Sequence, residues 1–247
     1  MRKFIPFAVL ILGVVVVAGA FLFLKNRGRG MVDDQQISDA DVAPAVSLDK
    51  RPVVSLTPSS DGHWLKMEIK KISIDAATLD YELTYKVPDG RTQGVPGTWK
   101  LATKDDIAKD MLLGSESSGR FRYDEGVENG NLTLRFRDTN GKLVAKFETN
   151  FKLYSNVENL ASEDDVFSLT LGRANARAFF VVMGTVGYSG NDKLSDSTKL
   201  YGFFTSSSDK YPAVVKMEGA SNLKYWDGSS WTSSFDKVGS GIFAGSY

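Results

Sequence analysis

Residues that could perform catalysis or bind a metal are scarce in this chain of 247 residues. His63 is the only histidine and there is no cysteine. A zinc site built from histidines, a thiolate nucleophile and a disulfide are therefore excluded. The glycine- and serine-rich run at 114–119 lacks the G-x-S-x-G spacing of a serine nucleophile. We predict no catalytic, cofactor-binding or metal-binding residue, and we interpret His63 as an ordinary surface residue.

Carboxylates occur in short runs that could support catalysis without histidine. Glycoside hydrolysis needs two carboxyl groups about 5 to 9.5 Å apart, and acidic runs lie at 105–106, 124–125 and 163–165. All three are in polar stretches that are typical of solvated loops. Asp138 and Asn140 could bind calcium, but Asp-x-Asn-Gly is also a turn pattern, which we favour. A carboxylate-dependent envelope glycan hydrolase remains an alternative function.

Aromatic residues gather in the C-terminal part of the chain. Tyr225, Trp226 and Trp231 stand beside Asp227 in a stretch rich in serine and glycine. Flat rings next to hydrogen-bonding groups are what a sugar-binding surface uses, so these three aromatics are our candidate ligand contacts. The alternative is that they fill the core of a small β domain, where aromatic side chains pack well.

The N-terminal segment predicts a membrane anchor. Residues 4–24 contain no charged or strongly polar side chain, and about 20 helical residues span a bilayer core. Residues 1–3 form a short tail, so we expect a transmembrane signal-anchor helix at 4–24 that contacts the lipid bilayer. The small residues 18–20 resemble a signal-peptidase site, but the apolar run continues through 21–24, which favours an anchor over cleavage after Ala20.

The charge distribution bears on orientation and partners. Residues 1–30 carry five basic and no acidic side chains, which leaves 25 basic and 30 acidic residues beyond. This mildly acidic body disfavours nucleic-acid binding. Basic residues flank both ends of the apolar run, so the charge rule alone is equivocal. The three-residue tail before an export-type segment favours a single-pass protein of the cell membrane, with its N-terminus inside and its C-terminal domain extracytoplasmic.

Beyond a polar linker at 25–60, the chain shows strand patterns. Apolar and polar residues alternate strictly at 79–87 and again at 132–136, where Asn140-Gly141 predicts a hairpin turn to 143–147. We expect residues 65–74 to form a strand that turns at 75–77 into the strand at 79–87. Val53 to Leu56 could add a first strand, and 104–113 shows near-helical spacing that predicts one short helix.

The strand order over residues 60–155 resembles an immunoglobulin-like or fibronectin-III-type β-sandwich. The resemblance concerns the fold alone, because the Cys-Trp-Cys hallmark is absent, and it transfers no functional residue. We therefore expect a β-sandwich domain at 61–155. Further alternating runs at 167–171, 179–183, 200–204 and 213–217 predict a second small β-rich domain at 156–247.

The fold class that follows is an N-terminal transmembrane helix joined to a mainly-β ectodomain. Its expected function is non-catalytic binding, adhesion or scaffolding at the cell envelope, with a cell-surface protein or glycan as partner and without a cofactor. A second alternative to the hydrolase is a bitopic subunit of a membrane assembly, in which the helix itself binds a partner through small residues such as Gly13.

Overall fold

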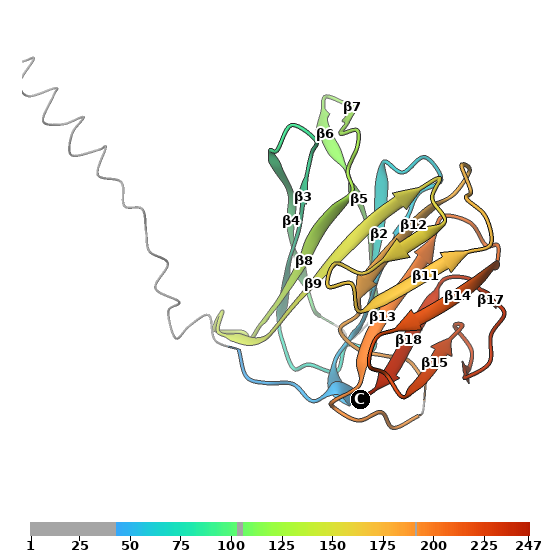
Figure 1. Cartoon of the computed structure of the whole chain (residues 1–247). Helices are drawn as coiled ribbons and strands as arrows, with labels where there is room; N and C mark the ends of the chain where they lie inside the picture. Colours follow the sequence, from blue (N-terminus) through green and yellow to red (C-terminus); the bar gives the residue numbers. More distant parts are fainter. Residues whose placement is uncertain (1–42, 103–105, 191) are drawn as a thin grey trace, which may run out of the picture. The chain divides into compact units, whose positions relative to one another are not determined.

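The computed structural model describes residues 43–102, 106–190 and 192–247. The described part of the chain is mainly β (Figure 1). The predicted signal-anchor at 4–24 and the first half of the predicted linker, 25–42, lie outside these residues. Among the helices of the described ranges, none is long and apolar enough to cross a membrane.

One 3-10 helix and nine strands form the first part of the described chain. They are η2 (Leu48–Lys50), β1 (Val53–Pro58), β2 (Trp64–Lys70), β3 (Thr78–Lys86), β4 (Thr92–Lys100), β5 (Ile107–Leu112), β6 (Gly114–Ser117), β7 (Arg120–Tyr123), β8 (Asn129–Arg137) and β9 (Leu143–Ser155). The folded unit thus begins inside the range predicted as linker, because Leu48 and Leu56 are buried.

Nine further strands complete the fold. They are β10 (Asn159–Ala161), β11 (Phe167–Leu171), β12 (Phe179–Gly184), β13 (Lys199–Thr205), β14 (Tyr211–Met217), β15 (Asn222–Trp226), β16 (Trp231–Thr232), β17 (Lys237–Val238) and β18 (Gly241–Ser246). The alternating runs predicted at 167–171, 179–183, 200–204 and 213–217 are confirmed as β11, β12, β13 and β14.

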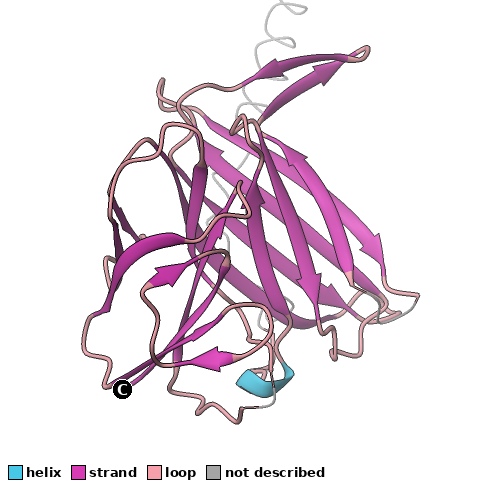
Figure 2. Ribbon diagram, turned by 90° about the vertical axis from the view of Figure 1, so that its right-hand side faces the viewer, coloured by secondary structure: helices cyan, strands magenta, loops and turns pink. Residues whose placement is uncertain are grey.

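The strands assemble into one large and three smaller antiparallel sheets (Figure 2). The large sheet has nine strands in the order β16-β15-β18-β13-β12-β9-β8-β3-β4. The smaller sheets are β1-β2-β5, β10-β11-β14-β17 and the two-stranded β6-β7. At one end of the large sheet, β4 pairs Pro96 with Glu82 of β3, and proline is accepted in such an end strand because its missing N–H can face solvent.

Side-chain alternation explains how the sheets stack. In β3, Leu79, Tyr81, Leu83 and Tyr85 are buried while the residues between them are partly exposed, as the sequence predicts. In β12 both faces are buried: Val181 and Met183 join the cluster that contains β1 and β2 side chains. Phe180 and Val182 join the cluster that contains β11 and β14 side chains. Because alternate residues point to opposite faces, β12 separates two hydrophobic cores.

The large sheet does not break where a boundary between two domains is predicted. β9 ends at Ser155, and its last residues pair with β12, with Phe151 opposite Met183 and Ser155 opposite Phe179. Strands from both sides of residue 155 therefore share one sheet. Residues Ala43–Tyr247 form one compact unit. The physical reason is that β12 has buried apolar side chains on both faces, so a covering layer is needed on each side of the sheet.

The predicted helix at 104–113 is wrong. Its described part is the strand β5, which pairs with β2 by placing Ile107 opposite Ile69 and Met111 opposite Leu65. Ile107 and Met111 are buried, whereas Lys109 between them is exposed at the free edge of the sheet. Edge strands often carry a charged residue at a position whose side chain would otherwise point inward. Here Lys109 takes the place of an apolar residue, which leaves Ile107, Met111 and Leu112 at helix-like spacing.

The predicted hairpin between 65–74 and 79–87 is also wrong. β2 ends at Lys70, and Lys71 has a positive φ of 56°. The chain then crosses from the three-stranded sheet to the nine-stranded sheet, where β3 lies. By contrast, the hairpin between β8 and β9 is confirmed. The Asp138 carboxylate accepts hydrogen bonds from the backbone N–H groups of Asn140 (2.8 Å) and Lys142 (2.9 Å), which is turn chemistry.

Candidate functional site

Two of the three predicted ligand-contact aromatics meet at the hairpin formed by β15 and β16. Trp226 lies opposite Trp231 in this pair, and their ring centroids are 5.7 Å apart with planes inclined by 51°. Both rings are half-buried and both line a cavity of about 490 Å³. We call this cavity the tryptophan pocket.

The third aromatic, Tyr225, does not reach the tryptophan pocket. It is 2% exposed and belongs to the second hydrophobic cluster. Its hydroxyl donates a hydrogen bond to the Gly239 carbonyl at 3.0 Å, and burial raises the pKa of the phenol. Strand alternation is the reason for this difference, because neighbouring residues in β15 point to opposite faces of the sheet.

The turn between β15 and β16 is fixed by one carboxylate. The Oδ1 atom of Asp227 accepts hydrogen bonds from the Ser229 hydroxyl (2.8 Å), the Ser229 N–H (3.0 Å) and the Ser230 N–H (3.1 Å). Together these hydrogen bonds lower the pKa of Asp227 to about 2, and the bond from the Ser229 hydroxyl contributes most. The charge on Asp227 therefore orders the turn that positions Trp231 beside Trp226.

The rest of the tryptophan pocket is polar. Lys224 Nζ and Asp192 Oδ2 form an ion pair at 2.8 Å. Four residues with hydroxyl groups also line the cavity, namely Ser229, Ser230, Thr232 and Ser233. Trp231 is held in place by its ring N–H, which donates to the Ser189 carbonyl at 3.0 Å. The pocket thus offers apolar ring surface together with donors and acceptors, which can bind a polyhydroxylated ligand.

Gly190 allows the two rings to occupy these positions. Its φ is +95°, and a Cβ atom at this residue would lie 2.8 Å from Trp226 Cζ3 and 2.8 Å from Trp231 Nε1. Any side chain here would displace the rings and would also strain the backbone. A glycine at 190 is therefore part of the tryptophan pocket.

A second and larger cavity lies elsewhere, with a volume of about 610 Å³. We call it the acidic cavity, because four carboxylates line it: Asp61, Asp124, Glu125 and Glu128. His63 also lines it, and its ring stacks on Tyr123 with centroids 4.1 Å apart and planes 11° apart. The sequence did not reveal this cavity, because its lining comes from short segments around residues 62, 126, 154 and 179.

The polar groups at this cavity are partly committed to local structure. Asp61 Oδ1 accepts hydrogen bonds from the Ser59 hydroxyl (2.5 Å) and the His63 N–H (3.1 Å), which lower the pKa of Asp61. Asp124 accepts a hydrogen bond from the Tyr85 hydroxyl at 2.9 Å. A general acid of a glycoside hydrolase requires a raised pKa, so Asp61 does not fit that role.

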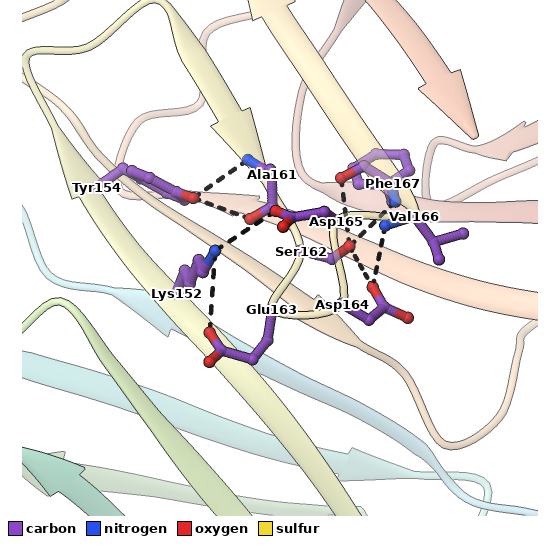
Figure 3. Close-up of polar contacts among 9 residues, drawn as sticks. All are labelled: Lys152, Tyr154, Ala161, Ser162, Glu163, Asp164, Asp165, Val166 and Phe167. Carbon is purple, nitrogen blue, oxygen red and sulfur yellow. Dashed lines mark hydrogen bonds and ion pairs between the residues drawn. The ribbon is translucent and has the colours of Figure 1, made fainter. Parts of the chain in front are cut away.

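The acidic run at 163–165 forms the turn between β10 and β11 (Figure 3). Lys152 Nζ lies 3.9 Å from Glu163 and 3.8 Å from Asp165. Burial would raise the pKa of Asp164, but hydrogen bonds from the hydroxyls of Ser162 (2.5 Å) and Tyr201 (2.6 Å) outweigh it and lower that pKa. The carboxylate of Asp164 therefore stabilises the turn in its ionised form. Of the third acidic run, Asp106 is exposed, and Asp105 lies outside the described residues.

Comparison with known proteins adds no family to this description. No protein-family model, curated protein or solved structure matches the chain.

Proposed function

We propose that this chain is a membrane-anchored extracytoplasmic protein whose β domain binds a glycan at the cell envelope without converting it. The single observation that carries the proposal is the tryptophan pocket, where Trp226 and Trp231 lie 5.7 Å apart in a cavity lined by hydroxyls and an ion pair. The apolar faces of a sugar ring pack on aromatic rings, while its hydroxyls need donors and acceptors of the kind that Lys224, Asp192 and the serines supply.

The anchoring part of the proposal rests on the apolar run at 4–24. Such a segment would tether the domain to the bilayer with the N-terminus inside and residues 43–247 outside. A tethered binding domain suits adhesion or scaffolding, because it holds a ligand at a membrane surface. The non-enzymatic character is also proposed; at the acidic cavity it is supported by the lowered pKa of Asp61, because a general acid of a glycoside hydrolase needs a raised pKa.

The immunoglobulin-like or fibronectin-III-type arrangement of the first part is proposed on strand order. β1-β2-β5 follow the order of strands A, B and E, and β4-β3-β8-β9 follow that of C′, C, F and G. This assignment also accounts for the crossing between β2 and β3, because strands B and C of such a sandwich belong to opposite sheets. It leaves the function unassigned, since sandwiches of this kind perform unrelated tasks.

The test of the binding function uses the full chain in detergent micelles and a panel of immobilised neutral and acidic oligosaccharides. We expect saturable binding of at least one oligosaccharide, measured afterwards by calorimetry in solution. Trp226→Ala should weaken that binding at least about 10-fold, which corresponds to about 1.4 kcal/mol. The matched control is Trp99→Ala, which removes an exposed tryptophan from β4 and should change affinity less than about 2-fold.

Two results would reject the glycan proposal. One is a panel on which the full chain binds no oligosaccharide, and the other is binding that Trp226→Ala leaves intact. Release of reducing sugar from a bound oligosaccharide by the purified chain would reject the non-catalytic part and favour the carboxylate-dependent hydrolase.

A further inference from the structure

The hairpin of β6 and β7 stands apart from the other sheets. It forms a sheet of its own, and Figures 1 and 2 show it projecting beyond the ends of the larger sheets. Its turn is tight because Ser118 (φ 53°) and Gly119 (φ 75°) both adopt the positive φ that a type I′ turn requires. An isolated two-stranded hairpin is marginally stable unless a face packs on something.

One face of this hairpin is aromatic and open to solvent. Phe121 is 46% exposed and Tyr123 is 37% exposed, with ring planes 10° apart and centroids 6.3 Å apart. Beneath them, His63 stacks on Tyr123 and the Trp64 ring meets Phe121 edge-on at 5.5 Å. Large rings exposed on a projecting element are typical of a surface that a partner covers.

The acidic cavity adjoins this aromatic face, because His63 belongs to both. Glu125 and Glu128 line the cavity and are exposed. The one lysine in its lining, Lys152, lies within ion-pair distance of Glu163 and Asp165, so its charge is offset. The residues that line the cavity therefore carry a net negative charge, which favours cationic ligands over phosphate and other anions.

We propose that the aromatic face of β6-β7 and the acidic cavity together form a docking surface for an extended, basic segment of a protein partner. Arginine or lysine side chains would place their cationic groups among Glu125, Glu128 and Asp61. Their aliphatic stems would lie against Phe121 and Tyr123, where cation–π contact adds to packing. Charge complementarity favours a basic segment over the other ligand classes. A neutral glycan would gain no charge attraction from the excess of carboxylates, and the phosphates of a nucleic acid would be repelled by them.

This inference is independent of the proposed glycan binding, because the two sites share no lining residue. The probe is a fluorescein-labelled peptide of eight alternating glycine and arginine residues. Its control is the same peptide with glutamine in place of arginine. The full chain is placed in phosphatidylcholine nanodiscs, whose neutral surface does not attract the probe, and binding is followed by fluorescence anisotropy at about 0.15 M salt.

We expect saturable binding of the arginine peptide and none of the glutamine peptide. Glu125→Gln with Glu128→Gln should weaken binding at least about 10-fold, as should Phe121→Ser with Tyr123→Ser. The matched charge control is Glu218→Gln with Asp236→Asn, two exposed residues outside the cavity, which should change affinity less than about 2-fold. Trp226→Ala should leave peptide binding unchanged.

The proposal is overturned if the arginine peptide fails to saturate, if the glutamine peptide binds equally well, or if the Glu125 and Glu128 variant binds like the control variant. Saturable binding of an oligosaccharide that Phe121→Ser abolishes would likewise overturn it in favour of a sugar ligand. If the aromatic double variant does not fold, the glutamine variant decides alone, because both glutamates are exposed and glutamine has nearly the same shape as glutamate.

Discussion

Phe180 and Val181 are neighbours in β12, yet their side chains enter two different hydrophobic cores. Both are fully buried, Phe180 in the cluster under β11 and β14 and Val181 in the cluster under β1 and β2. β12 thus contributes side chains to both cores and separates them. Loss of either core exposes one face of β12, so the two halves of the described unit depend on each other for stability.

The first prediction concerns this dependence. Phe180→Ala should lower the free energy of unfolding by about 3–5 kcal/mol and Met183→Ala by about 2–5 kcal/mol, although the two side chains belong to different cores. In denaturant titrations of residues 43–247, each variant should show one transition with a lowered midpoint, by both circular dichroism and tryptophan fluorescence. Two separate transitions, only one of them shifted by each substitution, would contradict this expectation.

The second prediction concerns the pH dependence of the β15–β16 turn. The pKa of Asp227 is about 2 in the folded chain and about 3.9 for an unfolded aspartate. A lowered folded pKa means that the ionised carboxylate stabilises the fold above pH about 4, and that this contribution is lost as the pH falls towards 2. Asp227→Asn should therefore lower the thermal midpoint at pH 6.

The difference between the wild type and Asp227→Asn should shrink steadily between pH 4 and pH 2. Asp209→Asn offers a comparison, because Asp209 accepts a hydrogen bond from the Ser207 hydroxyl in another loop. A difference for Asp227→Asn that stays constant down to pH 2 would show that its charge does not order the turn.

The third prediction addresses the geometry of the tryptophan pocket. Gly190→Ala places a Cβ atom 2.8 Å from both Trp226 and Trp231 and forces a non-glycine residue into a positive φ. The rings should move apart, and their fluorescence emission should shift to longer wavelength as they become more exposed. Gly228→Ala is the control, because Gly228 has a φ of 100° but a Cβ atom there would meet nothing within 4 Å. Equal emission spectra for both variants would refute the packing role of Gly190.

The fourth prediction concerns the anchor and its orientation. The full chain should remain in the membrane pellet after alkaline carbonate extraction, whereas residues 43–247 should be released. Because the chain has no cysteine, Thr139→Cys in the exposed β8–β9 turn introduces a single reactive thiol. A thiol reagent that does not cross membranes should label it in intact cells. A mature chain that begins at Phe21 and is found in the soluble fraction would refute the anchor.

Strand positions followed from the sequence because alternation decides which face of a strand is buried. The pattern at 79–87 became β3 and the Asn140-Gly141 turn joined β8 to β9. Alternation does not indicate with which other strand a given strand pairs. For this reason the predicted pairing of β2 with β3 is wrong. β5 was predicted as a helix because Lys109 stands where an alternating strand would place an apolar residue. What makes this segment a strand is its pairing with β2, which the local sequence does not reveal.

The candidate sites were predictable to different degrees. Trp226 and Trp231 are five residues apart around a recognisable turn, so their meeting could be expected from local sequence alone. Tyr225 and Trp226 are neighbours in one strand, so their side chains point to opposite faces. The sequence did not show which of the two faces the core and which faces the pocket, and Tyr225 is the buried one. The acidic cavity could not be anticipated, because His63, Glu128 and Phe179 come together only through the stacking of separate sheets.

Pro96 in β4 has a consequence for how copies of the described unit meet at high concentration. Crowding brings the ends of identical sheets close together, and an unprotected end strand would then recruit the same strand of a neighbouring copy into a growing ribbon. The missing proline N–H removes one rung from any such ladder. Copies of the described unit can therefore approach one another at high concentration without β4 joining them into a continuous sheet.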